Sequence, residues 1–230
     1  MIDYIKTNIC EVEEFELLKS NQFRTVYLVN NKLVVMFSAN AKVIFNWYMD
    51  NQNFAPATIY GTDECICYDY LVPSSDYVKK FHLLDFIRNF RPKLVSISDS
   101  EYYDAIEDEY RLNCINLGIN PQLPQRPVKE GLYQLHGNVD FDHTLVFDGK
   151  VILLDPRPIT GAILVDIMNM YLSSFEVLKM FDIEEIARTL NVPQTVVEYY
   201  YEIILLAKLN KIATKDAELF KQYLSLLSVR

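Results

Sequence analysis

The sequence predicts an α+β protein with a small β-rich N-terminal part and a larger helical C-terminal part. Residues 1–73 hold β-branched and aromatic runs that pair into two candidate hairpins. From about Asp76 onward, most apolar residues recur at helical spacing, and the predicted helices end near Pro or Gly. We therefore expect two domains, residues 1–73 and residues 74–230.

The β-rich part is expected to consist of strands, one helix and strands. Residues 23–38 place Asn30 and Asn31 between two strand-like runs, and Asn tolerates the positive φ of a two-residue hairpin turn. Residues 57–72 predict a second hairpin. Between them, apolar residues at 43, 44, 47 and 48 predict a helix that ends before Pro56.

The second part is expected to be mostly helical. Its one strand-rich stretch should be residues 135–158. Tyr199, Tyr200 and Tyr201 follow one another, and three successive rings cannot all point to one side of a helix. At least one of them is therefore expected to be exposed or to lie in an interface. The predicted helices cover residues 82–90, 100–119, 164–181, 183–190, 194–211 and 215–228.

The composition argues against several classes of protein. The chain has 31 Asp and Glu against 22 Lys and Arg, a net charge of −9, which makes nucleic acid an unexpected main partner. Its apolar runs are far shorter than the roughly 20 residues of a membrane span. Its first residues lack the pattern of a signal peptide. Its four cysteines are expected to be reduced thiols, so we expect a cytoplasmic protein without a membrane partner.

Residues 135–158, LHGNVDFDHTLVFDGKVILLDPRP, are the most informative stretch. Asp148 and Gly149 suit a type I′ turn between two strands. Counting outward from this turn places His143 opposite Leu154, and therefore beside Asp155. The loop before the hairpin leads to the same end and supplies further polar side chains, namely His136, Asn138, Asp140 and Asp142.

This group of polar side chains has three candidate roles. Carboxylate and amide oxygens suit a hard cation such as Mg²⁺. With equal weight, the Asp and Asn residues form turns and cap backbone groups. A zinc site made of His136, His143 and Asp155 is less favoured because a convincing fourth ligand is missing.

The same stretch resembles the catalytic segment of the aminoglycoside and choline phosphotransferases, which are relatives of protein kinases. In that group, H-G-D-x-x-x-x-N is followed by a short hairpin, an Asp often found as I-D-P, and a further Asp at the start of a helix. His136-Gly137-Asn138 corresponds to H-G-D and His143 to the Asn. Asp155 corresponds to the metal-binding Asp and Asp166 to the last Asp.

The resemblance implies a two-lobed, protein-kinase-like fold, with YDYL at 68–71 resembling the hinge between the lobes. It implies ATP and Mg²⁺ as cofactors, with Asp155 and His143 as metal ligands. The candidates around the nucleotide are the hinge residues Asp69, Tyr70 and Leu71, together with Met36 and Arg24.

Several departures from the family pattern fall on its chemistry. Asn138 stands where the family has the Asp that orients or deprotonates the acceptor, and an amide takes no proton near neutral pH. Met36 stands where a strand Lys would hold the phosphates. Residues 41–49 offer no Glu to pair with such a Lys, and the phosphate-covering loop at 19–27 contains no Gly.

Substitutes for the lost groups are present in the sequence. Lys32 or Lys42 is the alternative source of positive charge, and Asp140 or Asp142 is the alternative base. Asp166 also has a structural interpretation, because an Asp at a helix start caps backbone N–H groups.

We therefore expect a degenerate member of this group, with ATP and Mg²⁺ binding weak or absent. Its expected role is that of a pseudokinase-like regulator or inhibitor that binds another protein, for which 16 Tyr and 13 Phe offer contact area. The alternative is an ATP-dependent phosphotransferase acting on a small hydroxyl- or amino-bearing molecule. A metal-dependent hydrolase is the weakest alternative, because the sequence offers no nucleophile with its own base.

Overall fold

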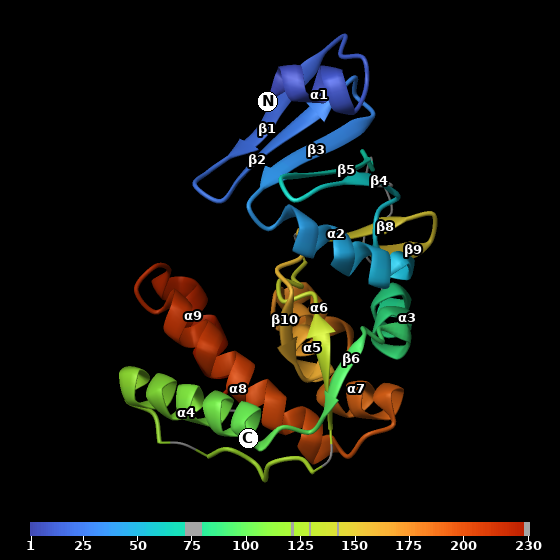
Figure 1. The fold of residues 1–230 in the computed structure, drawn as a ribbon. Coiled ribbons are helices and arrows are strands. Elements are labelled where there is room, and N and C mark those ends of the chain that lie inside the picture. The colour runs from blue at the N-terminus through green and yellow to red at the C-terminus, as the bar shows by residue number, and fades with distance from the viewer. Residues whose placement is uncertain (72–79, 121, 129, 142, 228–230) are drawn as a thin grey trace. The chain divides into compact units, whose positions relative to one another are not determined.

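The computed structural model describes residues 1–71, 80–120, 122–128, 130–141 and 143–227. The chain divides into two compact units (Figure 1). The N-terminal unit comprises residues 1–83 and 136–159, and the helical unit comprises residues 84–135 and 160–230. The segment with the predicted site therefore belongs to the N-terminal unit. The expected domain boundary after residue 73 lies outside the described residues and stays a prediction.

The N-terminal unit is built on a five-stranded antiparallel sheet with the order β1-β2-β3-β5-β4. Both predicted hairpins are confirmed, but the first turn differs in length. Three residues, not two, separate the paired Val29 and Leu33, and both Asn30 and Asn31 have positive φ. The turn is closed by a hydrogen bond in which the N–H of Lys32 donates to the Val29 carbonyl at 3.1 Å. The strands are β1 Phe15–Ser20, β2 Arg24–Val29, β3 Leu33–Ser38, β4 Thr58–Gly61 and β5 Cys65–Asp69.

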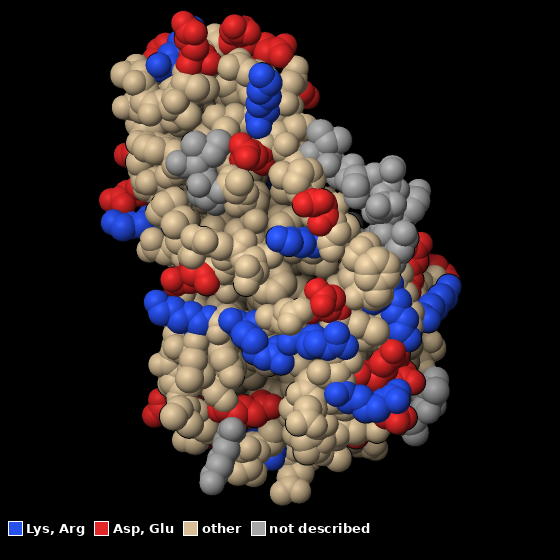
Figure 2. All heavy atoms as spheres, turned by 90° about the vertical axis from the view of Figure 1, so that its right-hand side faces the viewer, with Lys and Arg blue, Asp and Glu red and all other residues tan. Residues whose placement is uncertain are grey.

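Two helices pack with this sheet, namely α1 Ile2–Asn8 and α2 Ala41–Asp50. The helix α2 is confirmed, whereas α1 was not predicted because its seven residues are too short for a clear period. Ile5 of α1 is buried in one cluster with Val29, Val35 and Cys67. Figure 2 shows acidic side chains gathered at the end of this unit where α1 lies.

The predicted hairpin consists of β8 Thr144–Phe147 and β9 Lys150–Leu153, and its register is confirmed. Asp148 and Gly149 both have positive φ, and Phe147 pairs with Lys150. The N–H of Leu154 donates to the His143 carbonyl at 2.8 Å, as the count from the turn predicted.

His136 is fully buried in this unit, where its ring packs edge-on against Trp47 of α2 at 4.8 Å between centroids. Burial, together with the smaller effect of the nearby His143, lowers the pKa of His136 to about 3. The Nδ1 atom of His136 accepts a hydrogen bond from the N–H of Asn138 at 3.3 Å, which requires an unprotonated nitrogen.

The central helix of the helical unit is α8 Gln194–Ile212, which contacts α4, α5, α7 and α9. Tyr199, Tyr200 and Tyr201 are all buried, so the expectation that one ring is exposed was wrong. Helices cover α8 on several sides, and the Tyr199 and Tyr200 hydroxyls donate to the carboxylates of Glu107 and Glu130 at 2.9 and 2.6 Å. The other helices are α4 Ser100–Leu117, α5 Ile163–Tyr171, α6 Phe175–Met180, α7 Ile183–Leu190 and α9 Ala217–Ser225, and α3 Lys80–Asn89 leads into this unit.

Two expectations for this half of the chain were wrong. The helix predicted over 164–181 is interrupted after Tyr171, because Ser174 caps a new helix by accepting the N–H of Glu176 at 3.1 Å. Strands also occur outside 135–158, in a three-stranded sheet with the order β10-β7-β6. These strands, β6 Leu94–Ile97, β7 Gly131–Leu135 and β10 Ile159–Gly161, are too short for a recognisable alternation. None of the described helices has the length and hydropathy to cross a membrane.

The free energy of unfolding should fall as the pH is lowered from 7 to 5. Below about pH 6.5, His136 is protonated in the unfolded chain, whereas in the folded protein it stays neutral down to about pH 3. Between these two pH values, lowering the pH therefore stabilises the unfolded state relative to the folded state. One pKa unit is about 1.4 kcal/mol, which gives a loss of about 2 kcal/mol at pH 5. Urea unfolding at pH 7, 6 and 5 measures it. If the free energy of unfolding of a His136→Gln variant fell with pH as steeply as that of the unchanged protein, this account would be contradicted.

Candidate functional site

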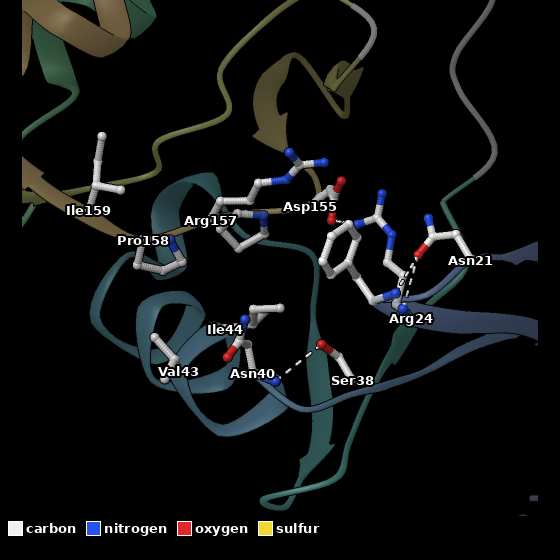
Figure 3. A pocket seen from close by; sticks show the side chains of 12 residues that line it. Asn21, Arg24, Ser38, Asn40, Val43, Ile44, Asp155, Arg157, Pro158 and Ile159 are labelled. Carbon is white, nitrogen blue, oxygen red and sulfur yellow. Dashed lines mark hydrogen bonds and ion pairs between the residues drawn. The ribbon is translucent and has the colours of Figure 1, made fainter. Parts of the chain in front are cut away.

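The main pocket of the N-terminal unit has a volume of about 460 Å³ and lies beside Asp155 (Figure 3). Three stretches of chain form its walls, namely residues 21–24, residues 38–44 and residues 155–159. They comprise the start of β2, the passage from β3 into α2, and the segment that follows β9. The pocket therefore brings together the loop at residues 21–24 and the end of the β8–β9 hairpin, both of which the sequence analysis singled out.

Asp155 pairs with a cation supplied by the chain itself. Its carboxylate forms an ion pair with the guanidinium of Arg24, and both side chains are about nine-tenths buried. Its backbone has φ +59°, a left-handed conformation that is uncommon for residues other than Gly, and its N–H donates to the Tyr48 hydroxyl at 3.2 Å. Burial lowers the pKa of Arg24, as does the nearby Arg157.

Asn138 lies next to Asp155, as the sequence predicted, but it acts as a donor. Its Nδ2 donates to the backbone carbonyl of Asp155 at 3.0 Å and lies 3.4 Å from the carboxylate oxygen Oδ2. The same nitrogen lies 3.4 Å from Nδ1 of His143. The amide therefore ties the loop to Asp155 and offers no basic atom to a substrate.

Asp140 and His143 form a closed turn. The Oδ1 atom of Asp140 accepts the backbone N–H of His143 and lies close to its Nδ1, both at 2.8 Å. The carbonyl of Asp140 accepts the hydroxyl of Thr144 at 2.6 Å. These contacts match the turn-and-cap interpretation of this loop. Asp142, the other alternative base, lies outside the described residues.

Gly137 allows the two halves of the site to approach each other. It has φ +72°, and a Cβ atom here would lie 2.2 Å from the carbonyl oxygen of Arg157. The N–H of Arg157 donates to the carbonyl of His136 at 2.7 Å. No residue with a side chain fits this close passage of two backbones.

The described residues do not fit a divalent metal ion. The predicted ligands Asp155 and His143 are 3.6 Å apart between Oδ2 and Nε2, but the carboxylate already faces the guanidinium of Arg24. Within the described part of the chain, no three or more His, Cys, Asp or Glu side chains are arranged to hold a metal. The zinc site considered for His136, His143 and Asp155 is thereby excluded. Arg24 places a positive charge directly beside this carboxylate.

Of the residues predicted around a nucleotide, only Arg24 lines the pocket among the described residues. Met36 is buried in β3, paired with Val26 and Ile66, and fills the core. Asp69 and Tyr70 already donate their N–H groups to carbonyls within the chain, at 3.0 and 2.7 Å. Leu71, the last described hinge residue, is half-buried.

The other candidate residues lie elsewhere. Lys42, considered as a source of charge, pairs with Asp63 at 2.9 Å on the surface, and Lys32 is exposed. Asp166 lies in the helical unit, fully buried in the first turn of α5. Sequence reasoning did not find the role of Tyr48, because its hydroxyl reaches Asp155 from a helix far away in the sequence.

Comparison with known proteins identifies the fold. No protein-family model matches the chain, and no curated protein matches its sequence. Among solved structures, a macrolide 2'-phosphotransferase from Brachybacterium faecium is similar, with a TM-score of 0.60 and 14% identity over 99% of this chain and 97% of that one.

Two further solved structures are similar over most of their length. An ADP-bound aminoglycoside phosphotransferase has a TM-score of 0.58 at 11% identity, over 98% of this chain and 95% of that one. A putative fructosamine-3-kinase from Haemophilus somnus has a TM-score of 0.53 at 14% identity, over 93% and 92%. At such identities the likeness concerns the fold. The chain thus has the two-lobed, protein-kinase-like fold of the aminoglycoside and macrolide phosphotransferases.

Proposed function

We propose that this kinase-fold protein acts by binding and does not transfer phosphate, as a pseudokinase-like regulator or inhibitor of another protein. The observation that carries the proposal is the ion pair between Arg24 and Asp155. The carboxylate that corresponds to the family's metal ligand is already neutralised, and its partner is part of the chain.

Departures from the family pattern occur at three positions on which phosphoryl transfer depends. That reaction depends on positioning and on neutralising the charge of the transferred group, mainly by metal ions and a Lys. Asp155 is engaged by Arg24, Met36 is apolar and buried, and Asn138 is a hydrogen-bond donor. A metal ion would have to displace a buried guanidinium before it could reach Asp155.

The edge strand β1 supports a protein partner. All six of its residues are exposed, and Phe15, Leu17 and Leu18 each leave about half of their surface accessible. An apolar edge strand is a surface to which a strand of a partner can add. The four cysteines are free thiols, which suits a reducing compartment such as the cytoplasm.

The rival function is that of an ATP-dependent phosphotransferase acting on a small hydroxyl- or amino-bearing molecule. One observation favours it, since the chain covers nearly the full length of phosphotransferases solved with nucleotides, including a complex of GDP and kanamycin. The following measurements separate the two functions.

Adding Mg²⁺ to ATP should not raise the unfolding temperature above that with ATP alone, and no ADP should form. Arg24 leaves Asp155 no free charge for Mg²⁺, so the metal has no differential affinity for the folded state. Thermal unfolding and an ADP-release assay measure both effects. A Mg²⁺-dependent stabilisation, together with ATP turnover that is lost in Asp155→Asn, would establish the rival function.

Arg24 and Asp155 should be strongly coupled in stability. Arg24→Met leaves a buried carboxylate without its partner, and should cost about 3 kcal/mol or more. The double variant with Asp155→Asn should cost less than the sum of the single variants by at least about 1 kcal/mol. Urea unfolding of the four proteins gives the coupling energy. Small, additive losses would show that the pair does not hold the site together.

A photocrosslinking amino acid at position 17 should form an adduct with a partner protein in cells. The same amino acid at position 150, an exposed residue at the start of β9 beside the hairpin turn, is the matched control and should form none. Mass spectrometry of the adducts identifies the partner. If position 17 gives no protein adduct, β1 is not a partner-binding edge, and the assignment of a protein partner to this edge is wrong.

A further inference from the structure

The pocket beside Asp155 holds more positive charge than Asp155 neutralises. The guanidinium groups of Arg24 and Arg157 lower the pKa of Lys19, and Arg157 also lowers that of Arg24. Figure 3 shows Arg24 and Arg157 extending toward Asp155, which among the described residues is the one acidic side chain that lines the pocket. A local excess of positive charge in a chain of net charge −9 points to an anionic ligand.

The start of α2 adds to this positive potential. The helix begins at Ala41, directly after the lining residue Asn40, and Asn40 as N-cap residue makes no side-chain cap hydrogen bond. The first turn of α2 contains no acidic residue. Helix N-termini carry a partial positive charge and N–H groups that bind anions. The helix start therefore reinforces the two guanidinium groups.

Apart from Asn21, Ser38 and Asn40, the rest of the described pocket lining is apolar. Phe23 is 72% exposed although its backbone is fixed, since Oδ1 of Asn21 accepts the N–H groups of Phe23 and Arg24 at 2.9 and 3.1 Å. Val43 of α2 also lines the pocket and is 45% exposed. An apolar surface next to two guanidinium groups suits a ligand that combines an anion with a small organic group.

We propose that this pocket binds a small organic phosphate monoester without a divalent cation, with Arg157 and Arg24 holding the phosphate and Phe23 contacting the organic group. Arg24 and Arg157 together exceed the charge of Asp155 by one positive charge, which favours a phosphate group, and the planar donors of Arg suit its oxygens. A volume of about 460 Å³ is in the range of small-molecule sites. The hinge residues Asp69, Tyr70 and Leu71 do not line the pocket, so the site differs from one built around the hinge.

Phenyl phosphate is a direct probe, with inorganic phosphate and phenol as its two halves. In titration calorimetry with EDTA present, phenyl phosphate should bind the full chain more tightly than either half. Arg157→Gln should weaken it at least about tenfold, as expected for the loss of a charge-assisted pair. Lys150→Gln removes one exposed positive charge from the same unit and should leave the affinity unchanged.

Several outcomes would overturn the inference. These are no binding of phenyl phosphate, binding that requires Mg²⁺, or equal losses in Arg157→Gln and Lys150→Gln. A capped phosphotyrosine peptide that binds more than about tenfold tighter would overturn the assignment to a free small molecule and indicate a phosphorylated partner. Failure of phenyl phosphate to bind leaves the proposed function intact, whereas Mg²⁺-dependent ATP turnover would overturn that function alone.

Discussion

The ion pair between Arg24 and Asp155 is the interaction on which the arrangement of the site depends. A carboxylate that is mostly buried is costly to keep ionised unless a positive group lies beside it. Arg24 provides that group from the first residue of β2, while Asp155 follows β9, so the pair fastens the hairpin to the five-stranded sheet. Asn138 and Tyr48 then complete the surroundings of Asp155 through its backbone carbonyl and N–H.

A guanidinium differs from a metal ion in what it permits. Mg²⁺ keeps several exchangeable positions and bridges phosphate oxygens as they move, whereas Arg24 is tethered to the chain and donates along fixed directions. Under the proposed binding function, such a site would retain an anion and would not support the charge redistribution that accompanies group transfer. The buried Met36 and the donating amide of Asn138 are consistent with that difference.

Local chemistry made part of the fold predictable. Asp148 and Gly149 fixed the turn and hence the register of the hairpin, because few residues adopt positive φ without strain. The burial of residues 199–201 was missed, since an apolar-face argument assumes a helix with one exposed side. For the site, the sequence analysis correctly placed Asn138 and His143 near Asp155, but it did not predict the ion pair of Asp155 with Arg24. That contact joins distant stretches through the sheet, and no local spacing encodes it.

The close passage of backbone at Gly137 bears on how motifs of this kind are interpreted. The glycine is required by steric exclusion alone, because the carbonyl of Arg157 occupies the space of a side chain. This requirement for glycine holds whether position 138 carries a catalytic Asp or, as here, an Asn. The pair His136-Gly137 therefore indicates the fold alone. Catalytic activity has to be judged from the charged and basic groups around it.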